Sequence, residues 1–323
     1  MEYHILAGTD LKVSRACLGT MTFGSQVDET TARRMLDRSL EAGVNFLDTA
    51  NSYNKGSSEQ ILGRILEGKR HQLILASKVF NKMGEGPDDK GLSRAAIHKA
   101  IDATLSRLKT DYLDIYYLHQ PDSHTPIQET LEATDGLIRR GKVRCLATSN
   151  YSAWQICRML WLCQKNGWSA PLISQPMYNL LARGIELEYL PFTGEFGISS
   201  IVYNPLAGGL LTGKQRGDAG PIPGSRFDGN RMYLNRYWHE ANFQAVAELA
   251  AIAARCGRTL VDLSLAWVWQ QSAIEGLILG ASRMEQLEEN LRALDSGPLD
   301  ESTLEACDAV REKLRGVTPR YNR

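Results

Sequence analysis

The sequence has no excess of charge of either sign. Its 323 residues include 37 lysines and arginines and 37 aspartates and glutamates. A balanced chain has no general attraction for nucleic acid or for an anionic membrane, so neither partner is expected. Any site that binds an anion must therefore be local.

Long apolar runs and paired cysteine motifs are also missing. No run approaches the roughly 20 residues of a membrane-spanning helix, and the start Met-Glu-Tyr-His-Ile-Leu does not have the pattern of a signal peptide. No Cys-x-x-Cys pair occurs, and the cysteines fit reduced, buried thiols better than disulfides or metal ligands. We therefore expect a cytoplasmic protein. The six cysteines are Cys17, Cys145, Cys157, Cys163, Cys256 and Cys307.

A dinucleotide-binding turn of the form Gly-x-Gly-x-x-Gly is absent too, since Gly19 stands alone after an early apolar segment. This absence argues against a doubly wound open sheet, the main competing architecture. Eight short apolar segments are present instead, each followed by a predicted helix or by a loop and a helix. The predicted strands are residues 16–18, 44–47, 73–77, 113–118, 145–148, 172–174, 199–202 and 277–279.

This alternation predicts parallel βα units. At this length, the eight units are expected to close into a (β/α)8 TIM barrel, which is an α/β fold. A hairpin is predicted before the barrel, a long irregular insertion after strand seven as far as Tyr237, and a C-terminal helix and tail over the active-site rim. Ser93 is a predicted N-cap, and the run from Ser57 has the features of a capping box. No linker or shift in composition marks a boundary, so residues 1–323 are expected to form a single domain.

Chemically active side chains stand at or just beyond the ends of three successive predicted strands. Asp48 ends the second strand, Lys78 the third and His119 the fourth, while Tyr53 lies in the loop after the second. Reactive groups in such barrels lie at the C-terminal ends of the strands. We therefore expect these four side chains on one rim.

These four residue types suit a proton-donor site. A free phenol has a pKa near about 10 and is a poor acid at neutral pH. A nearby ammonium favours the phenolate, and a carboxylate holds that ammonium in place. An imidazole can orient a carbonyl or assist the proton transfer. Taken singly, each residue also fits a structural role, as a loop or cap residue, a packed ring, a rim ion pair or a turn residue.

Longer motifs surround these residues. They are Leu47-Asp48-Thr-Ala-Asn-Ser-Tyr53, Ser77-Lys78, Tyr117-Leu-His119-Gln-Pro-Asp122, Ser149-Asn150, Ser174-Gln175 and Gly280-Ala-Ser-Arg-Met-Glu-Gln-Leu-Glu-Glu-Asn290. Over nearly its whole length the chain thereby resembles the aldo-keto reductase family. The resemblance implies Asp48, Tyr53, Lys78 and His119 as a catalytic tetrad, with Tyr53 as the general acid.

The resemblance also implies NADPH or NADP+ as the cofactor. Ser149, Asn150 and Gln175 would hold the carboxamide, which needs both donors and acceptors, and Tyr203 would stack on the nicotinamide. The loop 204–214 would wrap the pyrophosphate, because glycines let backbone N–H groups approach an anion. The implied cofactor residues are Gly19, Thr20, Met21, Asp48, Ser149, Asn150, Gln175, Tyr203, Asn204, Pro205, Leu206, Gly208, Leu210, Lys214, Arg226, Gly280, Ser282, Arg283, Gln286, Glu289 and Asn290.

The last part of that set concerns the adenosine end. Ser282 and Arg283 precede a predicted helix, so an anion would meet its N-terminus, and Arg283 would favour a 2′-phosphate. Gln286, Glu289 and Asn290 share one helix face and would hold the adenosine. A solvated helix face is the plainer alternative for these three.

A closer likeness is carried by the segments 203–214, Arg226-Phe, Asn235-Arg236-Tyr-Trp238 and Tyr321-Asn-Arg323. These segments resemble the aflatoxin-aldehyde and succinic-semialdehyde reductase subgroup. The likeness implies that Arg236 and Arg323 face the substrate, where two guanidinium groups could bind a carboxylate. The implied substrate contacts are Tyr53, His119, Asn150, Arg236 and Arg323.

The resulting expectation is an NADPH-dependent reductase of aldehydes and some ketones, with a small-molecule carbonyl substrate. One alternative is a regulatory subunit like the potassium-channel β subunits. The sequence has no long N-terminal arm, which argues against a role in blocking a channel. Another is a Schiff-base aldolase with Lys78 as nucleophile, which leaves Tyr53 without a role. A metal site from His119 and His124 is not expected, because Pro121 opposes a helix that would align them. Homo-oligomerisation stays open.

Overall fold

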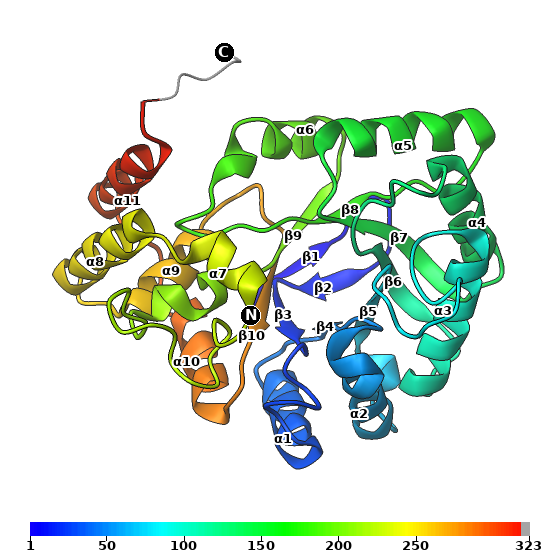
Figure 1. The fold of residues 1–323 in the computed structure, drawn as a ribbon, viewed down its shortest axis with the longest axis horizontal. Coiled ribbons are helices and arrows are strands. Elements are labelled where there is room, and N and C mark those ends of the chain that lie inside the picture. The colour runs from blue at the N-terminus through cyan, green and yellow to red at the C-terminus, as the bar shows by residue number, and fades with distance from the viewer. Residues whose placement is uncertain (318–323) are drawn as a thin grey trace. The chain divides into compact units, whose positions relative to one another are not determined.

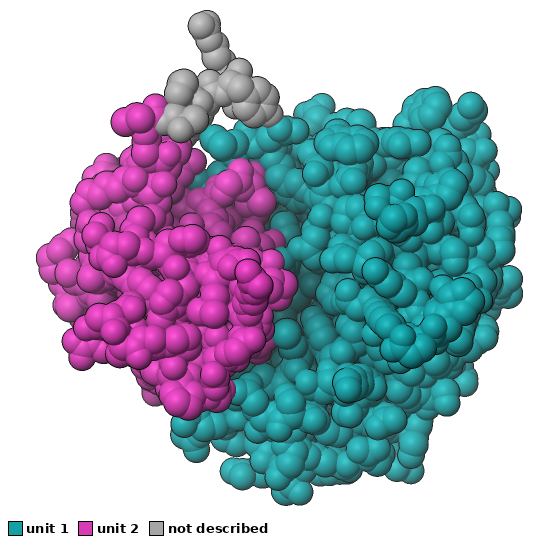
Figure 2. Space-filling view, in the orientation of Figure 1, with its two compact units in different colours: residues 1–176, 186–203, 273–287 teal, residues 177–185, 204–272, 288–323 magenta. Residues whose placement is uncertain are grey.

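The computed structural model describes residues 1–317. The chain divides into two compact units, which Figure 2 colours separately. The first unit comprises residues 1–176, 186–203 and 273–287, and the second comprises residues 177–185, 204–272 and 288–323. The expected placement of the C-terminal tail, including Arg323, falls outside the described residues.

Eight parallel strands of the first unit close into a barrel, as predicted (Figure 1). Each strand pairs with its successor, and β10 pairs back with β3. All eight predicted strands are confirmed, with ends that move by no more than two residues. They are β3 (Ala16–Gly19), β4 (Phe46–Asp48), β5 (Ile74–Val79), β6 (Leu113–Leu118), β7 (Val143–Ser149), β8 (Ile173–Gln175), β9 (Ser199–Val202) and β10 (Gly276–Gly280).

Figure 1 shows the helices of the first unit outside these strands. They are α1 (Glu29–Glu41), η1 (Tyr53–Gly56), α2 (Ser57–Ile65), η2 (Arg70–Gln72), α3 (Arg94–Leu108), α4 (Ile127–Arg139), α5 (Ala153–Asn166) and α6 (Tyr189–Glu195). The second unit contains η4 (Ala207–Thr212), α7 (Arg231–Tyr237), α8 (Glu240–Arg255), α9 (Leu260–Trp269) and α11 (Glu301–Arg315). Two segments run from one unit into the other, η3 (Gly184–Glu186) and α10 (Met284–Leu294).

The N-terminal hairpin, β1 (Tyr3–Ile5) and β2 (Lys12–Ser14), forms as predicted. Its loop lies at the N-terminal ends of the strands, because the Ala7 amide donates to Ser199 Oγ at the start of β9, at 2.9 Å. A Cβ on Gly8, whose φ is +65°, would lie 2.4 Å from the Leu172 side chain just before β8. The hairpin therefore closes the end of the barrel opposite the catalytic candidates.

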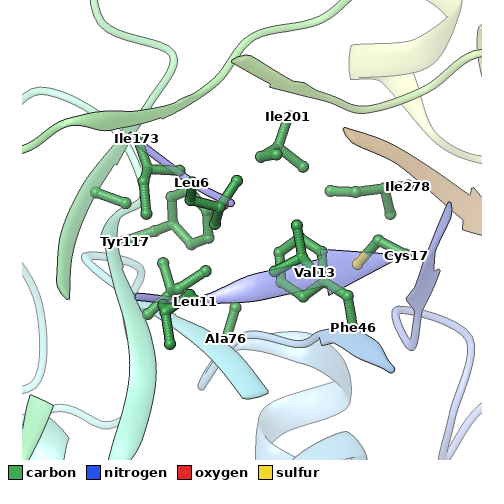
Figure 3. Packing of buried hydrophobic residues seen from close by; sticks show 12 residues of the cluster. Leu6, Leu11, Val13, Cys17, Phe46, Ala76, Tyr117, Ile173, Ile201 and Ile278 are labelled. Atoms are coloured by element: carbon green, nitrogen blue, oxygen red, sulfur yellow. The ribbon is translucent and has the colours of Figure 1, made fainter. Parts of the chain in front are cut away.

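The barrel core joins this hairpin to all eight strands (Figure 3). Leu6, Leu11 and Val13 come from the hairpin segment and are at most 1% exposed. Burial of each such side chain contributes about 1.5–3 kcal/mol, so the hairpin is held as part of the barrel. The strand side chains of this core are Cys17, Phe46, Ala76, Ile115, Tyr117, Ala147, Ile173, Ile201 and Ile278.

Two local expectations are wrong, and a third is confirmed. Ser93 accepts from the Ala96 amide at 3.2 Å and caps α3 as predicted. No capping box starts α2, whose N-cap is Gly56 without a side-chain hydrogen bond. Nearby polar side chains have tertiary partners instead, since Ser58 Oγ donates to the Thr20 carbonyl at 2.9 Å. The insertion expected to be irregular includes the helix α7.

Within residues 1–317, no helix is both long and apolar enough to cross a membrane. All six cysteines carry free thiols. In the described part of the chain, no group of three or more His, Cys, Asp and Glu side chains could hold a metal ion.

Candidate active site

Lys78 is the centre of a buried polar cluster at the C-terminal ends of β4 and β5. Its ammonium contacts the Asp48 carboxylate and also donates to the Thr49 carbonyl at 2.8 Å and to the Tyr53 hydroxyl at 3.1 Å. The side chains of Lys78 and Asp48 are 0% and 3% exposed. Three of the four predicted catalytic residues are therefore in direct contact.

The register of the strands explains this meeting. Asp48 pairs with Ala76, and Lys78 follows two residues later on the same face of β5. Tyr53 begins η1, which turns sharply because Asn54 and Lys55 adopt left-handed φ angles of 50° and 56°. The Asn54 amide holds this turn by donating to the Phe23 carbonyl at 2.7 Å. The left-handed turn and this long-range hydrogen bond together hold the loop that carries Tyr53.

The electrostatics of this cluster keep Lys78 charged. Burial alone would lower the pKa of Lys78, but Asp48 and Tyr53 outweigh it and raise that pKa above its ordinary value. An ammonium in a buried site attracts a phenolate strongly, because the surrounding dielectric is low. The site can therefore stabilise the negative charge that Tyr53 carries after it releases a proton.

His119 follows β6 and meets the same cluster. Its ring lies edge-on to the Tyr53 ring, with centroids 6.1 Å apart. Burial and the charge of Lys78 lower the pKa of His119 to about 3, so the imidazole is neutral near pH 7 and acts through hydrogen bonds. Asn81 contacts its Nδ1 atom at 3.2 Å. Sequence reasoning missed Asn81, because an asparagine in a polar loop after a strand carries no distinguishing signal.

The expected carboxamide-binding residues form one network along the rim. Ser149 Oγ donates to the Gln175 carbonyl at 2.9 Å. The Asn150 amide donates to the His119 carbonyl at 2.9 Å, and its Oδ1 accepts from the Tyr203 hydroxyl at 2.7 Å. The structure thus brings these predicted residues together with a member of the proposed tetrad.

Asp48 joins that network to the buried cluster. Its Oδ2 accepts from the Gln175 amide at 2.8 Å, and its backbone carbonyl accepts from the Thr20 amide at 3.0 Å. Gly19, just before Thr20, has no room for a side chain, since a Cβ there would lie 2.7 Å from Ile278. Met21 is 39% exposed. The segment 19–21 therefore lies beside Asp48.

A pocket of about 590 Å³ lies where the loop before α1 meets the start of α10. Arg34 and Arg283 line it, together with the carboxylates of Asp28 and Glu285. Asp28 already caps α1, and the hydrogen bonds from Thr31 lower its pKa. Within residues 1–317, the two guanidinium groups form no ion pair, so they remain able to bind an anion.

Three of the predicted adenosine-end residues lie around the start of α10, namely Ser282, Arg283 and Gln286. Ser282 donates through its amide and its hydroxyl to Gln286 Oε1, at 2.8 Å and 3.0 Å. Gly280 ends β10 and is exposed. In the second unit, Asn290 is 3% exposed and Glu289 is half-buried.

The second unit contains the loop 204–214, for which the resemblance predicts a contact with a pyrophosphate. Asn204 Oδ1 accepts from the Gly208 amide at 2.7 Å, and Asn204 Nδ2 donates to the Tyr237 hydroxyl at 2.8 Å. Gly208 has a φ of +69°, and a Cβ there would lie 2.6 Å from the Tyr233 ring. Only glycine fits this position without strain. The remaining predicted members are Pro205 and Leu210, which are buried, Leu206, which is half-buried, and Lys214, which is exposed.

Two predicted arginines meet at Tyr233 in the same unit. The guanidinium carbons of Arg226 and Arg236 each lie 5.6 Å from the centroid of that ring. Cation–π contacts of this kind favour a fixed orientation of the guanidinium group. Arg323, the other predicted substrate residue, lies outside the described residues.

Comparisons with known proteins find a matching family and several similar proteins. The model of the Aldo/keto reductase family matches residues 15–312. Aflatoxin B1 aldehyde reductase member 2 of Rattus norvegicus is 37% identical over 320 residues, which cover 95% of this chain and 87% of the rat protein. Aldo-keto reductase family 7 member A3 of Homo sapiens is 35% identical over 323 residues, covering 95% and 96%. A probable voltage-gated potassium channel subunit beta of Arabidopsis thaliana is 38% identical over 307 residues, covering 93% of each chain.

Proposed function

Because the chain belongs to the aldo/keto reductase family, we propose that it reduces aldehydes and some ketones to alcohols with NADPH. The family and the relatives support the coarser statement, an oxidoreductase that acts on carbonyls. The observation that carries the finer proposal is the position of the Lys78 ammonium. It lies between the Asp48 carboxylate and the Tyr53 hydroxyl, and 3.1 Å from the latter.

In this proposal each member of the tetrad has one task. NADPH, when bound, supplies the hydride that reaches the carbonyl carbon. Tyr53 donates its proton to the carbonyl oxygen as negative charge develops there. Lys78 stabilises the resulting phenolate, and Asp48 holds Lys78 in place. His119, neutral near pH 7, orients the carbonyl oxygen through a hydrogen bond.

The side chains present fit such a cofactor. Asn150 and Gln175 offer amide donors and acceptors at the rim, as a carboxamide requires, and Tyr203 offers an aromatic ring beside them. Arg283 lines a pocket of about 590 Å³ and has the charge to attract a 2′-phosphate. In the second unit, we propose that the backbone of 204–214 and Arg226 bind the phosphates.

The raised pKa of Lys78 argues against the aldolase alternative, because a Schiff-base nucleophile needs a neutral amine at working pH.

We also propose that residues 1–323 act as one domain, since the family match runs through both units. We propose a cytoplasmic location because all six cysteines carry free thiols, which are typical of a reducing compartment.

A substrate panel tests the proposed function directly. Consumption of NADPH and NADH is measured against succinic semialdehyde, methylglyoxal and nitrobenzaldehyde. We expect turnover of at least the reactive nitrobenzaldehyde, and faster turnover with NADPH than with NADH. A chain that binds NADPH but reduces none of the three aldehydes would contradict the proposal.

Replacing Arg283 with glutamine is expected to weaken the preference for NADPH. A hydrogen bond to a charged group contributes about 1.5–3 kcal/mol, so the KM for NADPH should rise about tenfold or more. The KM for NADH should change little, because NADH has no 2′-phosphate. The control is Arg292→Gln, which removes the same charge from the last turn of α10. Equal effects of Arg283→Gln on both cofactors would refute the assignment.

We propose that Arg236 binds a substrate carboxylate. Arg236→Gln should raise the KM for succinic semialdehyde about tenfold to a hundredfold, with little change for the uncharged nitrobenzaldehyde. The matched control is Arg231→Gln, at the exposed start of the same helix. If Arg236→Gln changed both aldehydes alike, the effect would come from packing on Tyr233 rather than from charge recognition.

A second candidate function is that of a regulatory subunit, which the similarity to a probable potassium channel subunit beta favours. A channel subunit of this kind would bind a membrane protein and turn over aldehydes slowly. Co-purification with a channel, together with negligible turnover in the substrate panel, would favour this function over the reductase.

A further inference from the structure

Asn81 is the only described side chain that hydrogen-bonds to the His119 ring. Its Nδ2 atom lies 3.2 Å from His119 Nδ1. An amide NH2 group only donates hydrogen bonds, so Nδ1 must accept and carries no proton. A neutral imidazole then holds its proton on Nε2. Within residues 1–317, Nε2 has no hydrogen-bond partner, which leaves that N–H for a ligand.

We propose that Asn81 is a positioning residue that holds His119 in the Nε2-protonated tautomer. In this tautomer, Nε2–H can donate to the carbonyl oxygen that Tyr53 protonates. The opposite tautomer would present a lone pair to that oxygen and repel it. The inference rests on the proposed reductase function for its catalytic consequence.

A second contact ties Asn81 to the proton donor. The same Nδ2 atom donates to Ser52 Oγ at 3.2 Å, and Ser52 directly precedes Tyr53 in the chain. The His119 backbone is held separately, because its carbonyl accepts from the Asn150 amide at 2.9 Å. Asn81 therefore links the loop that carries Tyr53 to the ring of His119, and Asn150 holds the His119 backbone.

The charges around His119 make the tautomer the deciding property. The titratable groups that face it are Lys78 from β5 and Tyr53 from η1, whereas Asn81 and Asn150 are neutral amides. Burial and the charge of Lys78 lower the pKa of His119 to about 3. The ring is thus uncharged between pH 5 and pH 8, so its tautomer determines whether Nε2 donates or accepts a hydrogen bond.

The substitution Asn81→Asp changes this contact while keeping the shape of the side chain. A carboxylate accepts hydrogen bonds, so it favours a proton on Nδ1 and raises the pKa of the imidazole. At pH 8 we expect a kcat for nitrobenzaldehyde about a hundredfold below that of the unmodified protein. At lower pH the imidazolium carries protons on both nitrogens, and kcat should recover in part.

The unmodified protein should show no such recovery on the acid side, because His119 does not titrate there. Asn166→Asp, at the exposed end of α5, adds the same charge away from the rim and should leave the pH profile unchanged. Asn81→Ala, which removes the donor without adding charge, should lower kcat about tenfold at every pH. Identical pH profiles for the unmodified protein and Asn81→Asp would overturn the inference.

Nitrogen-15 NMR of the histidine rings measures the tautomer without any substrate. Among the six histidines, His119 is assigned by the signal that disappears in His119→Gln. We expect a protonated Nε2 in the unmodified protein and a protonated Nδ1 in Asn81→Asp. A proton on Nδ1 of the unmodified protein would overturn this inference alone. Absence of aldehyde turnover in the unmodified protein would instead overturn the proposed function.

Discussion

Replacement of Tyr53 with phenylalanine is expected to remove nearly all turnover of nitrobenzaldehyde while NADPH binding is retained. Phenylalanine keeps the ring that meets His119 edge-on, but it has no proton to give to the developing alkoxide. A positioned general acid contributes about 10²–10⁴-fold to the rate, so kcat should fall by that range. Steady-state kinetics measures the loss, and a fluorescence titration with NADPH measures the binding.

The matched control is Tyr116→Phe on β6. The Tyr116 hydroxyl is buried and has no hydrogen-bond partner in the described part of the chain. Its removal should leave kcat close to that of the unmodified protein. If Tyr53→Phe kept full turnover, another group would have to supply the proton, and Tyr53 would be only a packing residue.

Replacement of Lys78 with methionine is expected to lower both the turnover rate and the free energy of unfolding. The change leaves the Asp48 carboxylate, which is 3% exposed, without its cation. Removal of one partner from a buried ion pair typically costs about 3–5 kcal/mol. Urea-induced unfolding at pH 7 measures this loss of free energy of unfolding. Turnover should fall as well, because the phenolate of Tyr53 loses the ammonium that stabilises it.

The pH at which this comparison is made matters. The pKa of Lys78 is raised in the folded chain above its ordinary value of 10.5. A raised pKa means that the stabilisation is fully present below pH 10.5 and is lost only as the pH rises through the folded-state value. A free energy of unfolding measured at pH 7 therefore includes the whole contribution of the pair of Lys78 and Asp48.

A double substitution separates charge from packing. Lys78→Met combined with Asp48→Asn removes both charges and should recover part of the lost stability, because no uncompensated carboxylate stays buried. Turnover should remain as low as in the single variant. A single variant as stable as the unmodified protein would show that the Asp48 carboxylate finds another partner or a proton.

Much of the fold follows from local patterns in the sequence. Each strand is a short, largely apolar segment, and the helices between them have apolar residues at helical spacing. Asp48, Lys78 and His119 were predicted as neighbours because the C-terminal ends of parallel strands share one edge. Such a prediction needs no knowledge of side-chain contacts, since closure of the barrel brings these positions together.

Other features follow from no local pattern. The run from Ser57 has the residues of a capping box, but burial gives Ser58 a partner at Thr20, and α2 starts without a side-chain cap. The helix α7 lies in a segment predicted to be irregular, and its buried Tyr233 packs with Arg226 and Arg236. A tertiary partner decided the first of these outcomes, because a buried hydroxyl left without a hydrogen bond costs about 1–3 kcal/mol.

The sequence alone determined which chemical groups stand at the rim, because their places are set by where each strand ends. Only the tertiary structure decided how those groups bond. Asn81 and His119 are 38 positions apart, and Asp48 and Gln175 are 127 positions apart. Their contacts depend on angles and distances that closure of the barrel imposes. The protonation of His119 and the charge of Lys78 follow from those contacts and from burial, and neither has a signature in the order of the residues.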